Sequence, residues 1–310
     1  MSTEYGTGTA YRTSTVPVNG GELAVGIWGP DDAPTILAIH GITASHVSWT
    51  SLAEAMPGMR IIAPDLRGRG RSNGLPGPWG MPTHAADMVA LLDAFNLQRP
   101  VVVGHSMGAF VAATLAAQSP DRVAELILID GGIPIPTPAG VAAEDLPKAL
   151  IGPAAERLSM TFESVQDYRD FWRGHPAFAD DWTPAVEAYV DYDLDGEAPS
   201  LSPSSRYDAV AEDSLQLSGD IGYADALAGL PMPVSFIRAP RGLMNEPRAL
   251  YSASTVEEWE ERMPHLSTHE IADVNHYTIV MARRGADEVA AVARRAVARM
   301  AGDPSRSAAG

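Results

Sequence analysis

Cysteine is absent from this chain of 310 residues. Disulfide bonds, thiolate nucleophiles and cysteine-based metal sites are therefore excluded. The chain also lacks a run of about 18 apolar residues, the length that a membrane-spanning helix needs. Its first residues, MSTEYGTGTA, are polar and contain no apolar segment of the kind found in secretion signals. We therefore expect a cytoplasmic protein.

Positive charge is scarce as well. The 22 lysine and arginine residues face 39 aspartate and glutamate residues, which gives a formal net charge of −17. Nucleic acids and anionic membranes bind cationic surfaces, so neither is expected as a partner. Hydrophobic residues make up 45% of the chain. That content can fill the core of one large α/β domain, with or without an insertion.

Apolar, strand-like segments alternate with segments of helical periodicity in the first half of the chain. The strand-like segments are 35–41, 60–65, 100–106 and 125–131, and helical patterns fill 81–98 and 107–120. This alternation is typical of a parallel sheet with crossover helices. The sequence therefore predicts an α/β fold with a mostly parallel central sheet flanked by helices.

The alternation stops after Gly132 and resumes with strand-like segments at 233–240 and 268–273, followed by an alanine-rich helical pattern. An insertion therefore separates two parts of one core. We expect the core over 1–132 and 226–302, a helical lid over 133–225, and a flexible tail over 303–310.

Ser106 lies where a buried strand is expected to end and a helix to begin, in VVVGHSMGAF. Gly104 and Gly108 flank it in G-x-S-x-G spacing, which is typical of a nucleophile elbow. Such a turn lifts the serine hydroxyl above the sheet edge and places the backbone N–H of Met107 beside it. The alternative is a tightly packed glycine turn without a chemical role.

Together with this elbow, further motifs resemble those of the α/β-hydrolase superfamily over roughly residues 11 to 300. His40 and Gly41 end the first parallel strand, where the family has its oxyanion loop, and APDLRGRGRS at 63–72 resembles the family's Asp-x-x-Gly-x-Gly-x-Ser loop. The resemblance implies that the N–H groups of Ile42 and Met107 form an oxyanion hole. It gives His40 a role in shaping this loop or in contacting substrate.

A serine nucleophile needs an imidazole base that a carboxylate orients. The chain has eight histidines, and His276 lies after the last expected strand and before the last helix, where the superfamily has its base. His105 lies inside the elbow and faces a neighbouring loop in the family, so it is not expected to be the base. The positions of the other histidines match the base position of the superfamily less well than that of His276.

Two residues remain open as the acid of the triad. Asp130 ends the strand that precedes the insertion, as in some lid-bearing members of the superfamily, although it could instead orient the start of the lid. Glu246 follows the strand at 233–240, near the family's usual acid position, which falls here on Gly242. Asp130 is our first prediction and Glu246 the alternative.

The expected lid is rich in aromatic residues, with eight of the chain's 21 between Phe162 and Tyr192. We expect Phe171, Trp172 and Trp182 to contact substrate, although such rings can also serve only to hold small helices together. The acidic stretch DYDLDG at 191–196 resembles the start of a calcium loop, but Ser202 stands where that loop requires a glutamate. Neither a metal nor a cofactor is expected.

These features predict a serine hydrolase that cleaves a carboxylic ester or lactone of a largely apolar, uncharged small molecule through an acyl-enzyme. Three alternatives stay open: a carbon–carbon bond hydrolase of ring-cleavage products, an enzyme similar to proline iminopeptidases, and a slow-turnover ligand receptor. Ring-cleavage products carry carboxylates, so Arg157, Arg169 or Arg173 in the pocket would favour the first alternative. The oligomeric state, including a homodimer, is left open.

Overall fold

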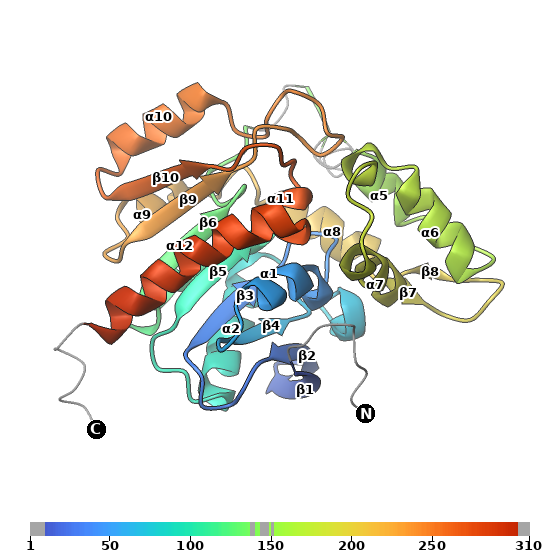
Figure 1. Cartoon of the computed structure of the whole chain (residues 1–310), viewed down its shortest axis with the longest axis horizontal. Helices are drawn as coiled ribbons and strands as arrows, with labels where there is room; N and C mark the ends of the chain where they lie inside the picture. The colour runs from blue at the N-terminus through green and yellow to red at the C-terminus, as the bar shows by residue number, and fades with distance from the viewer. Residues whose placement is uncertain (1–9, 137–139, 143–148, 150–151, 303–310) are drawn as a thin grey trace.

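A computed structural model describes residues 10–302 apart from 137–139, 143–148 and 150–151, so the tail expected at 303–310 lies outside the described residues. Its centre is an eight-stranded sheet in the order β1-β2-β4-β3-β5-β6-β9-β10 (Figure 1). The strands are β1 (Tyr11–Val18), β2 (Gly21–Trp28), β3 (Thr35–Ile39), β4 (Arg60–Pro64), β5 (Val101–His105), β6 (Glu125–Ile129), β9 (Val234–Arg238) and β10 (Leu266–Glu270). Strand β2 is antiparallel to both of its neighbours, and the other pairs are parallel. The predicted mostly parallel sheet is therefore confirmed.

Both faces of the sheet are covered, because the central strands are buried on either side. In β5, Val102 packs into one apolar cluster, while Val101 and Val103 pack into another on the opposite face. The first cluster includes residues of α2 (Met81–Ala94), α3 (Met107–Gln118) and α10 (Ala253–Arg262). The second includes residues of α1 (Thr50–Ala55), α11 (Thr278–Met281) and α12 (Arg283–Ala301). This continuous burial explains why the strands read as unbroken apolar segments in the sequence.

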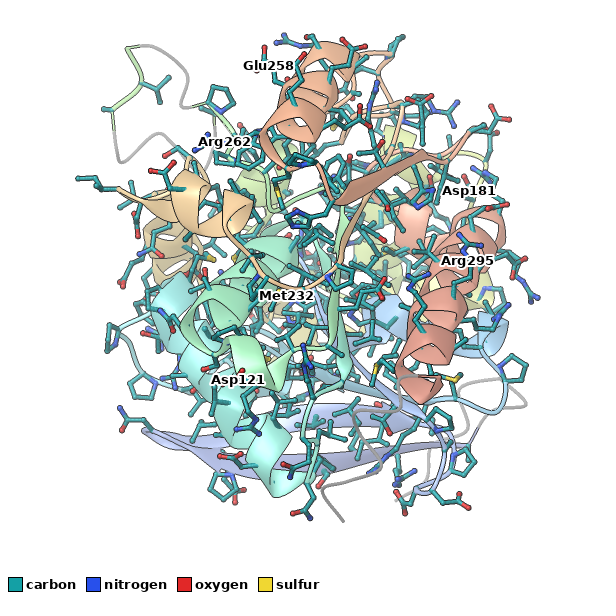
Figure 2. All side chains as sticks on the ribbon, turned by 90° about the vertical axis from the view of Figure 1, so that its left-hand side faces the viewer. Asp121, Asp181, Met232, Glu258, Arg262 and Arg295 are labelled. Atoms are coloured by element: carbon teal, nitrogen blue, oxygen red, sulfur yellow. The ribbon has the colours of Figure 1, made fainter. Side chains whose placement is uncertain are left out.

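Some of the acidic side chains lie on the surface of the molecule. Figure 2 shows Asp121 and Glu258 exposed at the surface, whereas Met232 is buried in the core.

No helix in the described ranges combines the length and the apolar character that crossing a bilayer would require.

The chain between β6 and β9 is mainly helical. It contains α5 (Pro153–Arg157), α6 (Val165–Arg173), α7 (Pro184–Tyr192), α8 (Tyr207–Ser214) and α9 (Tyr223–Ala228), with a small hairpin of β7 (Leu194–Asp195) and β8 (Ser202–Pro203). The hydroxyl groups of Ser164 and Thr183 cap the N-termini of α6 and α7 by accepting backbone N–H bonds. In Figure 1, α5, α6 and α7 gather at one end of the molecule, beside the central sheet.

Candidate active site

Ser106 occupies a strained turn between β5 and α3. Its φ of 54° and ψ of −124° lie in a region that residues other than glycine rarely adopt. The turn is held by the backbone N–H of Ser106, which donates to the carbonyl of Ile129 at 2.9 Å. A Cβ at Gly108 would lie 2.1 Å from the Ile39 carbonyl oxygen, and one at Gly104 would lie 2.4 Å from the Gly108 oxygen. Only glycine therefore allows the backbones to approach this closely.

His276 and Asp130 meet in the structure. The Nδ1–H of His276 donates to Oδ2 of Asp130 at 2.7 Å, and both side chains are almost completely buried. Because an ionised carboxylate only accepts hydrogen bonds, Nδ1 carries the proton and Nε2 is left as the basic nitrogen. The other carboxylate oxygen of Asp130 accepts the backbone N–H of Ala239 at 3.2 Å. Asp130 therefore fixes the orientation of the His276 ring.

Glu246, the alternative acid, lies in a different environment. It is exposed, and its carboxylate accepts the backbone N–H of Met244 at 2.7 Å within its own loop. Of the two carboxylates, the structure brings only Asp130 into a hydrogen bond with His276.

The segment after β3 presents a free backbone donor beside Ser106. Within the described part of the chain, the N–H groups of Ile42 and Met107 have no acceptor. The Gly41 carbonyl, which shares a peptide plane with the Ile42 N–H, accepts hydrogen bonds from Nδ1 of His40 at 2.7 Å and from the backbone of Ala44 at 3.1 Å. These bonds fix the direction of the Ile42 N–H, because C=O and N–H point in opposite directions across a trans peptide.

His40 lies beneath this loop and is not among the residues that line the cavity. It is completely buried, and its Nε2 accepts the backbone N–H of Leu66 at 2.9 Å, so both ring nitrogens are engaged. Burial lowers the pKa of His40 to about 4, so the ring is neutral at pH 7. We therefore assign His40 no substrate contact, and the structure supports the loop-shaping interpretation instead.

Two further residues hold the segment that carries His276. Nε2 of His105 donates to the His276 carbonyl oxygen at 2.8 Å, and burial lowers the pKa of His105 well below its ordinary value. The Oδ1 atom of Asn275 accepts the N–H groups of Tyr277 and Thr278, both at 3.0 Å, and its Nδ2 donates to the Ala177 carbonyl at 2.9 Å. The sequence alone did not indicate this link between Asn275 and the insertion.

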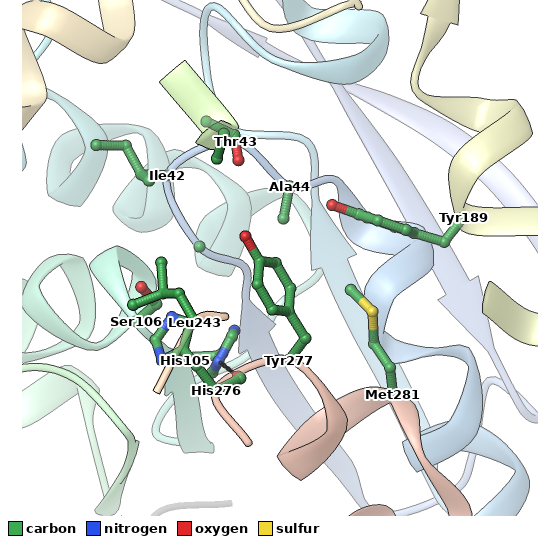
Figure 3. A pocket seen from close by; sticks show the side chains of 12 residues that line it. Ile42, Thr43, Ala44, His105, Ser106, Tyr189, Leu243, His276, Tyr277 and Met281 are labelled. Carbon is green, nitrogen blue, oxygen red and sulfur yellow. Dashed lines mark hydrogen bonds between the residues drawn. The ribbon is translucent and has the colours of Figure 1, made fainter. Parts of the chain in front are cut away.

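Ser106 and His276 line the same cavity (Figure 3). Its lining is mostly apolar, and the side chains that contribute are Ile42, Thr43, Ala44, His105, Ser106, Ala154, Tyr189, Leu243, His276, Tyr277 and Met281, together with Gly41.

Two tyrosines supply polar groups to the wall of this cavity. The hydroxyl groups of Tyr189 and Tyr277 have no hydrogen-bond partner among the described residues, and both point toward Ala44 in Figure 3. Burial raises the pKa of both tyrosines, so they are neutral donors at pH 7. The sequence analysis missed them, although the position of Tyr277 next to His276 was a signal that could have identified it.

The three lid aromatics that we expected to contact substrate do not line this cavity. Trp172 is buried against Tyr168, Phe178 and Tyr277, all with ring centroids 5.6–6.4 Å away. Phe171 packs on Phe162. The indole N–H of Trp182 donates to Glu187 at 3.1 Å, and the guanidinium group of Arg173 stacks on the Trp182 ring. We therefore assign them a packing role.

The arginines Arg157, Arg169 and Arg173 of the segment between β6 and β9 are engaged with carboxylates and are not among the residues that line the cavity. Arg157 is buried and contacts Asp193 and Tyr168, whereas Arg169 pairs with Asp191 and Glu187, and Arg173 pairs with Asp170 and Glu187. No Lys, Arg, Asp or Glu side chain is among the described residues that line the cavity.

The carboxylates of the acidic stretch 191–196 diverge. Asp191 bonds to Arg169, Asp193 to Arg157, and Asp195 to Asn73. In the ranges that the structure describes, no three His, Asp or Glu side chains are grouped so that they could hold a metal ion.

Comparison with known proteins agrees with this fold. Residues 34–183 match the model of the family described as alpha/beta hydrolase fold. The solved structure of E-2-(acetamidomethylene)succinate hydrolase superposes with a TM-score of 0.75 at 20% identity, covering 92% of this chain and 99% of that one, which shows the shared fold. The chain therefore has the alpha/beta hydrolase fold.

Among curated relatives, the chain is similar to a lipase and an esterase. Lipase LipV of Mycobacterium tuberculosis is 41% identical over 187 residues, which are 60% of this chain and 65% of LipV. The bifunctional esterase/perhydrolase DCH of Acinetobacter calcoaceticus is 34% identical over 134 residues, 42% of this chain and 49% of that protein. The chain thus spans less than two thirds of the length of either relative.

We predict that Gly108→Ala strongly destabilises the protein, because the new Cβ would lie 2.1 Å from the Ile39 carbonyl oxygen. Relief of this clash requires a backbone shift, which costs about 3 kcal/mol. Urea unfolding measures the loss. The control is Gly74→Ala, where nothing lies within 4 Å of the added Cβ and the free energy of unfolding should change little. Equal unfolding midpoints for the two variants would contradict the close approach at Gly108.

Proposed function

We propose that this protein is a serine hydrolase that cleaves a carboxylic ester or lactone of an uncharged small molecule through an acyl-enzyme. The observation that carries the proposal is the hydrogen bond of 2.7 Å between His276 and Asp130 beside Ser106 at one cavity. The similarity to a lipase and to an esterase/perhydrolase supports the same class of reaction.

In the first half of the proposed reaction, Oγ of Ser106 attacks the substrate carbonyl carbon while Nε2 of His276 accepts the hydroxyl proton. Asp130 keeps Nδ1 protonated and stabilises the imidazolium that forms. The negative charge that develops on the carbonyl oxygen is bound by the N–H groups of Ile42 and Met107. The tetrahedral intermediate then collapses, and the leaving alkoxide takes the proton from Nε2.

Water then hydrolyses the acyl-enzyme, and it takes the part of the nucleophile that Ser106 had in the first half of the reaction. His276 accepts a proton from the water molecule, whose oxygen attacks the acyl carbon. Ser106 leaves as the alcohol after it regains the proton from His276. These steps use only side chains and backbone groups of this chain, and no cofactor takes part in them.

The cavity lining favours uncharged esters over the alternatives. A carbon–carbon hydrolase of ring-cleavage products binds carboxylates, yet no arginine or lysine is among the described residues that line the cavity. An aminopeptidase binds a substrate ammonium, yet no aspartate or glutamate lines the same described surface. The apolar side chains suit an acyl chain, and the hydroxyl groups of Tyr189 and Tyr277 can donate to an ether or carbonyl oxygen of the substrate.

We predict that the protein hydrolyses p-nitrophenyl esters and lactones that carry no charge, and that Ser106→Ala lowers kcat by about 10⁴-fold or more. An ester with a free carboxylate on its acyl chain should react more slowly than its uncharged analogue, because no lysine or arginine among the described lining residues offsets the desolvation of that carboxylate. Ser119→Ala, at the far end of α3, is the matched control and should retain full activity. Stoichiometric binding without turnover across the panel would instead support the receptor alternative.

We predict that Asp130→Asn lowers kcat by about 10³ to 10⁴-fold, because the imidazole then prefers the wrong tautomer. Glu246→Gln should lower kcat less than about tenfold, near 1.4 kcal/mol of barrier. Urea unfolding establishes that both variants are folded. If Glu246→Gln causes the larger loss in folded protein, Glu246 is the acid and the role assigned to Asp130 is wrong.

A further inference from the structure

Arg69 lies between the segment after β3 and the helical insertion, and it is completely buried. Its Nε donates to the carbonyl oxygen of Ile42 at 2.9 Å. Its Nη1 forms an ion pair with Oδ2 of Asp213 at 2.5 Å and donates to the Arg67 carbonyl at 3.0 Å. One guanidinium group therefore connects the loop that carries the Ile42 N–H to an acidic side chain of α8.

Asp213 is equally buried and has several donors. Besides Arg69, it accepts the backbone N–H of Gly80 at 2.6 Å and Nε2 of His84 at 3.0 Å, both at the N-terminal end of α2. Burial alone raises the pKa of Asp213, but the attraction to Arg69 and His84 outweighs it and lowers the pKa to about 2. Asp213 is therefore ionised at pH 7, and it fixes Arg69 from the insertion side.

The position of Arg69 matters because Ile42 lies between two peptide planes. The plane before Ile42 is held at the Gly41 carbonyl by His40. The plane after Ile42 is held at the Ile42 carbonyl by Arg69. The two planes meet at the Cα atom of Ile42, so loss of the second bond leaves this atom held on one side only. A shift of the Cα atom would then carry the Ile42 N–H out of the oxyanion position.

We propose that Arg69 and Asp213 are positioning residues that hold the Ile42 N–H in the oxyanion geometry, so that packing of α8 against the core sets this part of the active site. The proposal rests on the hydrolase function proposed above. Neither residue touches the substrate. Both act through the orientation of one backbone group, which affects the transition state more than substrate binding.

The chain offers a matched control on the same loop. Arg67 is also buried and pairs with Asp87 of α2, with two N–O distances of 2.8 Å. Its remaining bonds go to the carbonyls of Pro76 and Asn19, away from the oxyanion segment. Loss of either ion pair leaves an unpaired buried charge and should destabilise the fold, but only one pair is connected to Ile42.

The experiment compares Arg69→Met and Asp213→Asn with Arg67→Met and Asp87→Asn. For each variant we would measure the free energy of unfolding, kcat and KM for an uncharged p-nitrophenyl ester, and the affinities of a trifluoromethyl ketone and its methyl ketone parent. The fluorinated ketone forms an adduct whose oxyanion mimics the tetrahedral intermediate. The methyl ketone reports ordinary binding.

All four variants are expected to be less stable than the parent protein. Only Arg69→Met and Asp213→Asn should lower kcat, by about 10 to 100-fold, and KM should change less than about threefold. The expected loss is smaller than the roughly 10² to 10³-fold that removal of a complete oxyanion donor costs, because the Ile42 N–H is displaced and not removed. The preference for the trifluoromethyl ketone over the methyl ketone should fall by the same factor. Similar kcat losses in the Arg67 and Asp87 variants, or unchanged kcat in folded Arg69→Met, would overturn the proposal.

Hydrogen exchange separates failure of this proposal from failure of the hydrolase function. The amide of Ala44 donates to Gly41 across the oxyanion segment and exchanges only when that segment opens. If the parent protein neither hydrolyses esters nor binds the fluorinated ketone, the proposed function fails. Positioning is still supported if the Ala44 amide exchanges at least about tenfold faster in Asp213→Asn than in Asp87→Asn. Equal exchange in the two variants contradicts it.

Discussion

The candidate active site depends on the register of the parallel strands β3, β5, β6 and β9. Backbone pairing continues past the strand ends into the site itself, because the N–H of Ser106 bonds to Ile129 and the N–H of Asp130 bonds to Ile237. The ladder that stabilises the sheet thus also sets the positions of Ser106 and Asp130, the proposed nucleophile and acid. A shift of one strand by one residue would turn these side chains to the opposite face.

The sequence predicted the features that depend on local pattern. Buried parallel strands are unbroken apolar runs, and the G-x-S-x-G turn has steric requirements that few other sequences meet, so the sheet and the position of Ser106 could be inferred directly. The sequence could not decide whether Asp130 or Glu246 is the carboxylate that contacts His276. That choice depends on which carboxylate His276 reaches across 146 residues of chain, and only the folded sheet defines that distance.

The insertion was harder to interpret for a different physical reason. A high density of aromatic residues indicates burial, but it does not tell whether a ring faces a cavity or another ring. Trp172 is surrounded by neighbouring rings and never reaches the cavity, whereas Tyr189, one helix further on, does. The direction of a side chain on a short helix is set by tertiary packing, and periodicity over nine residues is too short to define it.

Asn275 connects the turn that carries His276 to the insertion through its bond to Ala177, at a position where the superfamily often has glycine. With glycine, this turn would form without help from the insertion. Here the Asn275 side chain bonds to both segments, so a change in one segment affects the other. Replacement of the insertion with that of a relative would also change the segment whose Ala177 carbonyl accepts the Asn275 amide. In this chain, such an exchange therefore alters the support of the turn that carries His276 as well.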